Sequence, residues 1–185
     1  DVESRGLGDV YKRQLESIAP YLPKRLFIGG HSKGANLALY AALKASPEIQ
    51  QRIERVYVHD GPGFKEGAIS EEEWCRLEGR IHRSLPQESV VGLLMNCPVP
   101  YKVVNAQEHG LDQHSPFTWE VNDEYNDFSY AEKLSDGAQF FDAVFNKWLA
   151  QYSDSEAAAI VDALFRAIEA AGVTNASEIL SLIHI

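Results

Sequence analysis

Hydrophobic residues recur along the chain with spacings that predict a succession of strands and helices. An apolar run at residues 25–28, bounded by proline and glycine, indicates a buried strand. Residues 55–59 alternate between apolar and polar and stop at the Asp-Gly-Pro-Gly sequence of 60–63, which predicts a strand followed by a tight loop. Two further strands are expected at residues 80–85 and 101–104.

Helices are expected where apolar residues follow a helical period or where a start signal precedes them. The run from Ser70 to Glu73 is a capping box, which marks the first turn of a helix. The expected helical segments are 15–22, 36–45, 70–79, 87–95, 137–152 and 157–171. Strands that alternate with helices predict an α/β fold with a parallel sheet and flanking helices, followed by a C-terminal helical segment.

Length and charge restrict the class of protein and its partners. A chain of 185 residues is large enough for one domain or slightly more. Its 17 Lys and Arg against 27 Asp and Glu give a net charge of −10, which argues against nucleic acid or an anionic membrane as a partner. No apolar run approaches the roughly 20 residues of a transmembrane segment. The two cysteines are too few for a disulfide framework and favour a cytoplasmic location.

Neither end of the chain resembles a natural terminus. The sequence has no initiator methionine, and it closes on a short apolar tail. We therefore expect residues 1–13 and 180–185 to be non-native and exclude them from the fold, as is done for fusion scars.

The strongest chemical signal is Gly30-His31-Ser32-Lys33-Gly34, which fits the G-x-S-x-G pattern. An apolar strand precedes it and an Ala-rich helix follows, which is the strand–turn–helix setting of a nucleophilic serine. Ser32 is the predicted nucleophile, and the backbone N–H of Lys33 is a predicted oxyanion donor at the positive end of the helix dipole. The alternative is a glycine-rich turn in which Ser32 only caps the helix.

A nucleophilic serine needs a histidine base, which in this arrangement follows the last strand. His114 lies in a loop that is stiffened by Pro116 and anchored by aromatic residues, so we favour it over His109. Glu108, His109, Asp112 and His114 lack matching ligands elsewhere, so we expect neither a metal site nor a cofactor.

The acid of the triad is left open by the pattern of the residues. Asp60 directly follows a predicted strand, and Glu88 follows the next one. Asp112 is two residues from His114, which is too close in sequence for easy orientation of the ring. The role of either Asp60 or Glu88 would be to hold the imidazole tautomer and stabilise the imidazolium.

Four separated motifs resemble the landmarks of a known family. They are Gly29-Gly-His-Ser-Lys-Gly-Ala-Asn-Leu-Ala-Leu-Tyr-Ala-Ala42, Asp60-Gly-Pro-Gly-Phe64, Ser89-Val-Val-Gly-Leu-Leu94 and His114-Ser-Pro-Phe-Thr-Trp119. In this order they resemble the bacterial Mbeg-like family of unassigned function, which is related to lipases of the α/β-hydrolase superfamily. The resemblance covers roughly residues 15–175.

The resemblance implies a partial α/β-hydrolase fold with a lipase-like or esterase-like site. It places the nucleophile on Ser32 and the base on His114, and the acid near Glu88, where the aspartate typical of such lipases is absent. It divides the chain into the C-terminal part of a hydrolase domain at 14–125 and packed helices at 126–179. Because about four strands precede the nucleophile strand in that fold, we expect a C-terminal fragment that lacks the second oxyanion donor and is inactive alone.

The predicted function is that of a serine hydrolase that cleaves a small-molecule or lipid carboxylic ester through an acyl-serine intermediate, or transfers the acyl group to another alcohol. A non-catalytic α/β-hydrolase-like binding or scaffolding module is the alternative from a different class. A thioesterase or peptidase variant is a further alternative.

Overall fold

The computed structural model describes residues 2–149, 151–153, 155–156, 159–160, 162–163 and 166. They form two compact units. The amino-terminal unit contains Val2–Leu85 and Val91–Lys102, and the carboxy-terminal unit contains Pro86–Val90 and the described residues from Val103 onward. The tail at 180–185 and most of the helix expected at 157–171 lie outside the described residues.

The strands form a mostly parallel sheet, as the sequence predicts. They are β1 (Leu26–His31), β2 (Ile53–His59), β3 (Ile81–Pro86), β4 (Tyr101–Val104) and β7 (Tyr130–Ala131). The order is β1-β2-β3-β4-β7. The β1–β2 and β2–β3 pairs are parallel, and β4 pairs with β7 in antiparallel fashion. All four strands expected from the apolar runs are therefore confirmed, and the fold class is α/β.

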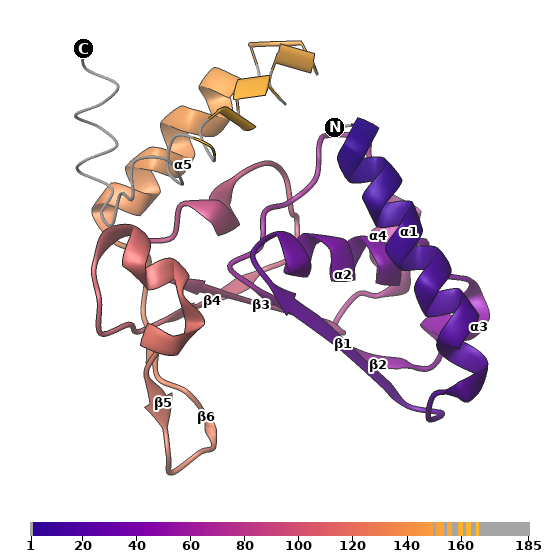
Figure 1. Ribbon diagram of the computed structural model, residues 1–185. Helices are drawn as coiled ribbons and strands as arrows, with labels where there is room; N and C mark the ends of the chain where they lie inside the picture. The colour runs from indigo at the N-terminus through magenta and orange to yellow at the C-terminus, as the bar shows by residue number, and fades with distance from the viewer. Residues whose placement is uncertain are drawn as a thin grey trace. The chain divides into compact units, whose positions relative to one another are not determined.

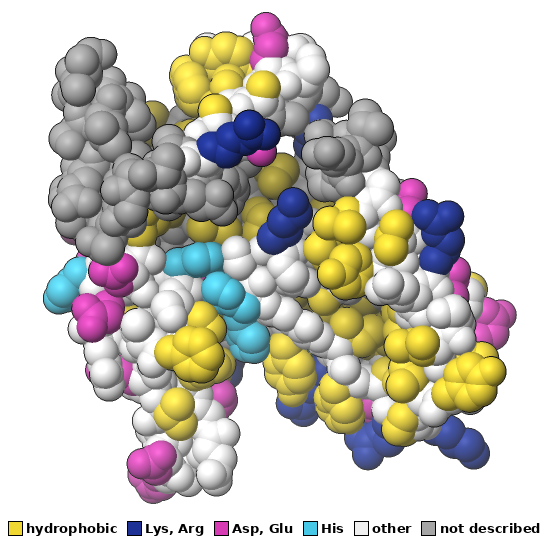
Figure 2. Space-filling view, in the orientation of Figure 1, with side chains coloured by type: hydrophobic (Ala, Val, Ile, Leu, Met, Phe, Trp, Pro, Cys, Tyr) yellow, Lys and Arg dark blue, Asp and Glu magenta, His cyan; other side chains and the backbone are white. Residues whose placement is uncertain are grey.

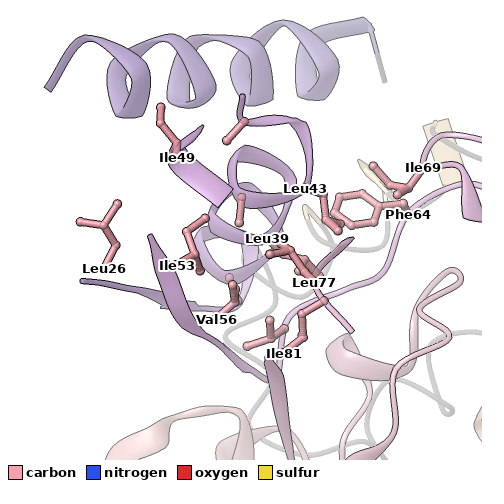
Figure 3. Packing of buried hydrophobic residues seen from close by; sticks show 14 of the residues in the cluster. Leu26, Leu39, Leu43, Ile49, Ile53, Val56, Phe64, Ile69, Leu77 and Ile81 are labelled. Carbon is pink, nitrogen blue, oxygen red and sulfur yellow. The ribbon is translucent and has the colours of Figure 1, made fainter. Parts of the chain in front are cut away.

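Helix α2 (Lys33–Lys44) packs on β1 and β2, and α1 (Val2–Ile18) packs on α2 (Figure 1). Leu39 and Leu43 of α2 are fully buried and contribute to a cluster with Val56 of β2 (Figure 3). The apolar face of α2 therefore holds the helix against the strands that precede and follow it. The short helices of this unit are η1 (Ala19–Tyr21), α3 (Pro47–Gln50), α4 (Glu71–Arg76) and η2 (Val91–Leu93).

Helix α1 extends well beyond the helix end expected at 15–22. It includes residues 2–13, which the sequence analysis left outside the fold. The Tyr40 hydroxyl donates to the Asp9 carboxylate at 3.1 Å, and a Cβ at Gly8 would lie 2.7 Å from the Tyr40 ring. This close approach joins α1 to α2. Helix α1 exposes the large apolar residues Leu7, Val10, Tyr11 and Ile18. Figure 2 shows hydrophobic side chains, in yellow, on the surface of the molecule.

Two expected helices differ from the sequence prediction, one in its end and one in its existence. The capping box forms as expected, with Ser70 and Glu73 each accepting from the other's backbone N–H, but α4 ends at Arg76. The helix expected at 87–95 is wrong, because the chain there forms a turn and the single 3-10 turn η2. Buried side chains take up backbone groups of this segment: Gly92 donates its N–H to Asp60 and offers its carbonyl to Arg83.

The carboxy-terminal unit follows β4 with short elements. These are η3 (Gly110–His114), η4 (Pro116–Thr118), the hairpin of β5 (Val121–Asn122) with β6 (Asp127–Phe128), then β7 and α5 (Asp136–Leu149). The helix predicted at 137–152 corresponds to α5. Among the described residues, no helix has the length and apolar character needed to cross a bilayer.

Candidate active site

Ser32 occupies the sharp turn between β1 and α2. Its backbone has φ 56° and ψ −134°, a positive-φ conformation that non-glycine residues rarely adopt. Such a conformation costs about 1–3 kcal/mol and persists only where the surroundings enforce it. The Ser32 side chain is half-buried and makes no capping hydrogen bond to α2. The turn is therefore strained without serving the capping role that was the alternative explanation for this serine.

Backbone hydrogen bonds hold the turn on both sides. The Ser32 N–H donates to the carbonyl of His59 at 3.0 Å, which ties the end of β1 to the end of β2. The Ser32 carbonyl accepts from the N–H of Ala35 at 3.0 Å and from that of Asn36 at 3.3 Å. Lys33 is the first residue of α2, so its N–H is one of the amides left free by helix geometry at the positive end of the dipole.

Two glycines allow the close approach that the turn requires. A Cβ at Gly30 would lie 2.6 Å from the Gly34 carbonyl carbon and oxygen. A Cβ at Gly61 would lie 2.6 Å from the Ala35 Cβ and 3.0 Å from the Ser32 carbonyl oxygen. A Cβ at Gly34 would meet nothing within 4 Å. The tight contacts at the turn are therefore at Gly30, which lies in the G-x-S-x-G pattern, and at Gly61, which lies outside it.

Asp60 lies beside Ser32 at the carboxyl ends of two adjacent parallel strands. His31 and His59 are register partners, so the residues that follow them, Ser32 and Asp60, leave the sheet at the same edge. The Asp60 side chain is only 1% exposed, and its backbone has φ 43°. Its Oδ1 accepts from the N–H of Gly92 at 3.0 Å, and its own N–H donates to the Ser84 carbonyl at 2.8 Å. A buried, oriented carboxylate thus stands next to the serine turn.

The first helix turn after Ser32 is attached directly to the loop that follows Asp60. The Asn36 side-chain amide donates to the carbonyls of Pro62 at 3.1 Å and Gly63 at 2.9 Å. Because Asn36 also donates its backbone N–H to Ser32, one residue fixes both loops. The sequence analysis did not single out Asn36, although it lies four residues after the predicted nucleophile.

His114 and Glu88 lie in the carboxy-terminal unit. His114 is half-buried at the end of η3, and Glu88 donates its backbone N–H to the Gln113 side chain at 2.9 Å. The Glu88 carboxylate accepts from the N–H of Gly110 at the start of η3. Glu88 therefore fixes the loop that carries His114 through the backbone of that loop.

Gln113 is the buried centre of this loop and was missed by the sequence analysis. Its side chain is 3% exposed and donates to the Glu108 carbonyl at 2.8 Å. Its backbone carbonyl accepts from the Trp119 indole at 2.7 Å. His114, the next residue, is half-buried, whereas His109 is exposed.

Electrostatics near the serine turn favour a neutral His59. Burial lowers the pKa of His59, and the neighbouring His31 lowers it further. A neutral imidazole at this position adds no positive charge beside Asp60. Within the described part of the chain, no three His, Cys, Asp or Glu side chains gather in a way that could hold a metal ion.

The fold and this site define an α/β protein with a strained serine at a strand–helix turn and a buried aspartate at the next strand end. The model of the Mbeg1-like family matches residues 8–166. The chain therefore belongs to the Mbeg1-like family, as its four motifs predict. No curated protein and no solved structure matches the chain.

Proposed function

We propose that this chain is a lipase-like or esterase-like serine hydrolase that acts on a carboxylic ester. The observation that carries the proposal is the backbone of Ser32, held at φ 56° between β1 and α2 without a capping bond. Strain of this kind in a non-glycine residue is concentrated at functional sites. The G-x-S-x-G context and the adjacent buried Asp60 support the same chemistry.

The proposed mechanism assigns one role to each residue. The Ser32 Oγ attacks the ester carbonyl carbon while His114 accepts the hydroxyl proton, and the Lys33 N–H binds the developing oxyanion. The protonated His114 then gives its proton to the leaving alcohol. Water, or another alcohol, repeats the sequence on the acyl-serine and releases the acid or a new ester.

Asp60 is the acid that this proposal favours. It is buried, it follows the strand next to β1, and the Gly92 N–H holds its carboxylate in one orientation. The carboxylate of Glu88 already accepts from the backbone of Gly110. We therefore assign Glu88 to supporting the loop of His114 and Asp60 to the triad.

The proposed substrate is a small-molecule or lipid ester, and the proposed location is a reducing cytoplasmic compartment. Both cysteines are free thiols, with Cys75 exposed and Cys97 half-buried. The Lys33 N–H is the one oxyanion donor that we assign.

A covalent probe tests the proposal better than turnover does, because an irreversible label accumulates even when the reaction is slow. The chain is incubated with a fluorescent fluorophosphonate, and the labelled peptide is identified by mass spectrometry. We expect time-dependent labelling at Ser32 that Ser32→Ala abolishes. Ser17→Ala, an exposed serine on α1, is the matched control and should label like the wild type.

Three results would overturn the hydrolase proposal. The first is absence of labelling in the wild type. The second is labelling of the folded chain at the same rate as the heat-denatured chain, and the third is labelling that survives Ser32→Ala. Any of these results, with a native circular dichroism spectrum, would favour the non-catalytic binding module instead.

A further inference from the structure

Arg83 is a buried cation in the middle of β3. Its side chain is 7% exposed, and its register partner in β2 is the buried Val58. Its guanidinium carbon Cζ lies over the Tyr101 ring, 5.6 Å from the ring centroid. In the described part of the chain, no carboxylate forms an ion pair with it. A buried charge without a counter-ion is costly, so the bonds that it makes must be needed.

Those bonds all go to the irregular segment at residues 91–99. The guanidinium donates to the carbonyls of Gly92 at 2.8 Å, Cys97 at 3.2 Å and Val99 at 2.9 Å. Besides the 3-10 turn η2, this segment makes only an isolated antiparallel bridge from Asn96 to Phe64, so no regular ladder satisfies the carbonyls of Gly92, Cys97 and Val99. The planar fork of an arginine can reach several fixed acceptors at once.

Gly92 links Arg83 to the proposed acid of the triad. Its carbonyl accepts from Arg83, and its N–H donates to the Asp60 carboxylate at 3.0 Å. We propose that Arg83 is a positioning residue: it holds Gly92 in place so that the Gly92 N–H orients the Asp60 carboxylate. This inference rests on the proposed hydrolase function only for its catalytic consequence, because the Arg83–Gly92–Asp60 connection can be tested without any activity.

Arg80 provides a matched control within the same unit. It also donates to three backbone carbonyls, those of Gln50, Ile53 and Arg76. None of these three carbonyls belongs to the segment at 91–99, whose Gly92 N–H donates to the Asp60 carboxylate. Replacing either arginine by methionine removes three bonds to backbone carbonyls while the apolar stem is kept, although Arg80 is half-buried and Arg83 is buried. A purely structural role for Arg83 predicts a loss of stability in both variants with no selective change at Gly92.

The first measurement is amide hydrogen exchange at Gly92, read by mass spectrometry or NMR in the full chain. We expect exchange at Gly92 to become at least about tenfold faster in Arg83→Met, since the amide loses its fixed position against Asp60. In Arg80→Met it should remain close to the wild-type rate. Equal exchange at Gly92 in the wild type and in Arg83→Met overturns the inference whether or not the protein is an enzyme.

The second measurement is the rate and pH dependence of fluorophosphonate labelling at Ser32, at a temperature where both variants are folded. We expect Arg83→Met to label at least about tenfold more slowly, because small displacements of catalytic groups are costly in rate. Its labelling profile should also shift to lower pH, since a misoriented Asp60 no longer stabilises the imidazolium. Arg80→Met should show neither change.

The outcomes separate the two proposals. Absence of labelling in the wild type refutes the hydrolase, while faster exchange at Gly92 in Arg83→Met would still support the connection to Asp60. Equal losses of labelling in Arg83→Met and Arg80→Met show a structural role only. If Arg83→Met does not fold, Arg83→Lys keeps the charge but loses the fork, and it should change both measurements in the same direction.

Discussion

The crowding at the serine turn predicts that two glycines of one motif respond oppositely to the same substitution. In Gly30→Ala, the new Cβ would lie 2.6 Å from the carbonyl carbon and oxygen of Gly34 and 2.7 Å from the Ala35 nitrogen. Ordinary contacts begin at 3.4 Å, so the shortfall against the nearest atoms is 3.4 − 2.6 = 0.8 Å. All three atoms belong to the backbone of the first turn of α2, which cannot rotate away as a side chain can. Overpacking of this kind costs about 1–3 kcal/mol.

Gly34→Ala is the matched control. Its Cβ meets nothing within 4 Å, and residue 34 is already helical. Replacing glycine by alanine at a compatible helical position stabilises by about 0.4–1 kcal/mol through the unfolded chain. The free energies of unfolding of the two variants should therefore differ by roughly 1.5–4 kcal/mol.

Urea unfolding followed by circular dichroism and tryptophan fluorescence measures this difference. Gly30→Ala should unfold at lower urea than the wild type, and Gly34→Ala at equal or higher urea. Similar slopes of the free energy against urea would show that the compactness of the two states is unchanged. Equal midpoints for the two variants, or the reverse order, would show that the turn is not packed as described.

Three further predictions concern Gly61, the two candidate acids and His59. Gly61→Ala places a Cβ 2.6 Å from the Cβ of Ala35, so the free energy of unfolding should fall by about 1–3 kcal/mol and the melting temperature should fall with it. An unchanged melting temperature would contradict the contact. Asp60→Asn should slow fluorophosphonate labelling by at least about 10²-fold and Glu88→Gln by less than about tenfold, and the opposite order would move the triad acid to Glu88. Burial lowers the pKa of His59 below the value near 6.5 that it has in the unfolded chain. As the pH falls through that value, the unfolded state therefore binds more protons than the folded state, and the free energy of unfolding decreases. The melting temperature should therefore fall more in the wild type than in His59→Gln between about pH 7.5 and pH 5.5, and parallel curves would refute this.

The first two strands were predictable because each contains apolar residues and has strong boundaries. Residues 26–28 lie between a proline and two glycines, and residues 55–59 end at a Gly-Pro-Gly loop. The pairs β5–β6 and β4–β7 could not be found in this way, since β5, β6 and β7 are two residues long and show no period. The helix expected at 87–95 failed for a different reason: local propensity was overridden by tertiary bonds from Asp60 and Arg83 to Gly92.

The nucleophile candidate was predictable from local sequence, whereas our preference for Asp60 as the proposed acid rests on the structure. The G-x-S-x-G pattern with its strand and helix contains the information that places Ser32 on a turn. Asp60 and Glu88 both follow strands, so the pattern alone leaves them equivalent. Their hydrogen bonds differ, and each involves a residue far away along the chain. The Glu88 carboxylate accepts from Gly110, 22 residues later, and the Asp60 carboxylate accepts from Gly92, 32 residues later.

Arg83 shows where a signal was present in the sequence and was not used. In the strand from Ile81 to Pro86, alternate residues point to the same face, so Arg83 shares a face with Ile81 and Leu85. Both of these neighbours are buried, and the same parity therefore places the guanidinium inside rather than in solvent. An arginine at an inward strand position needs several acceptors, and the nearest source is a segment that forms no regular helix or strand. The carbonyls of the irregular segment at 91–99 thus satisfy the inward arginine, and the arginine in turn satisfies these carbonyls. Gly92 of the same segment donates its N–H to the Asp60 carboxylate.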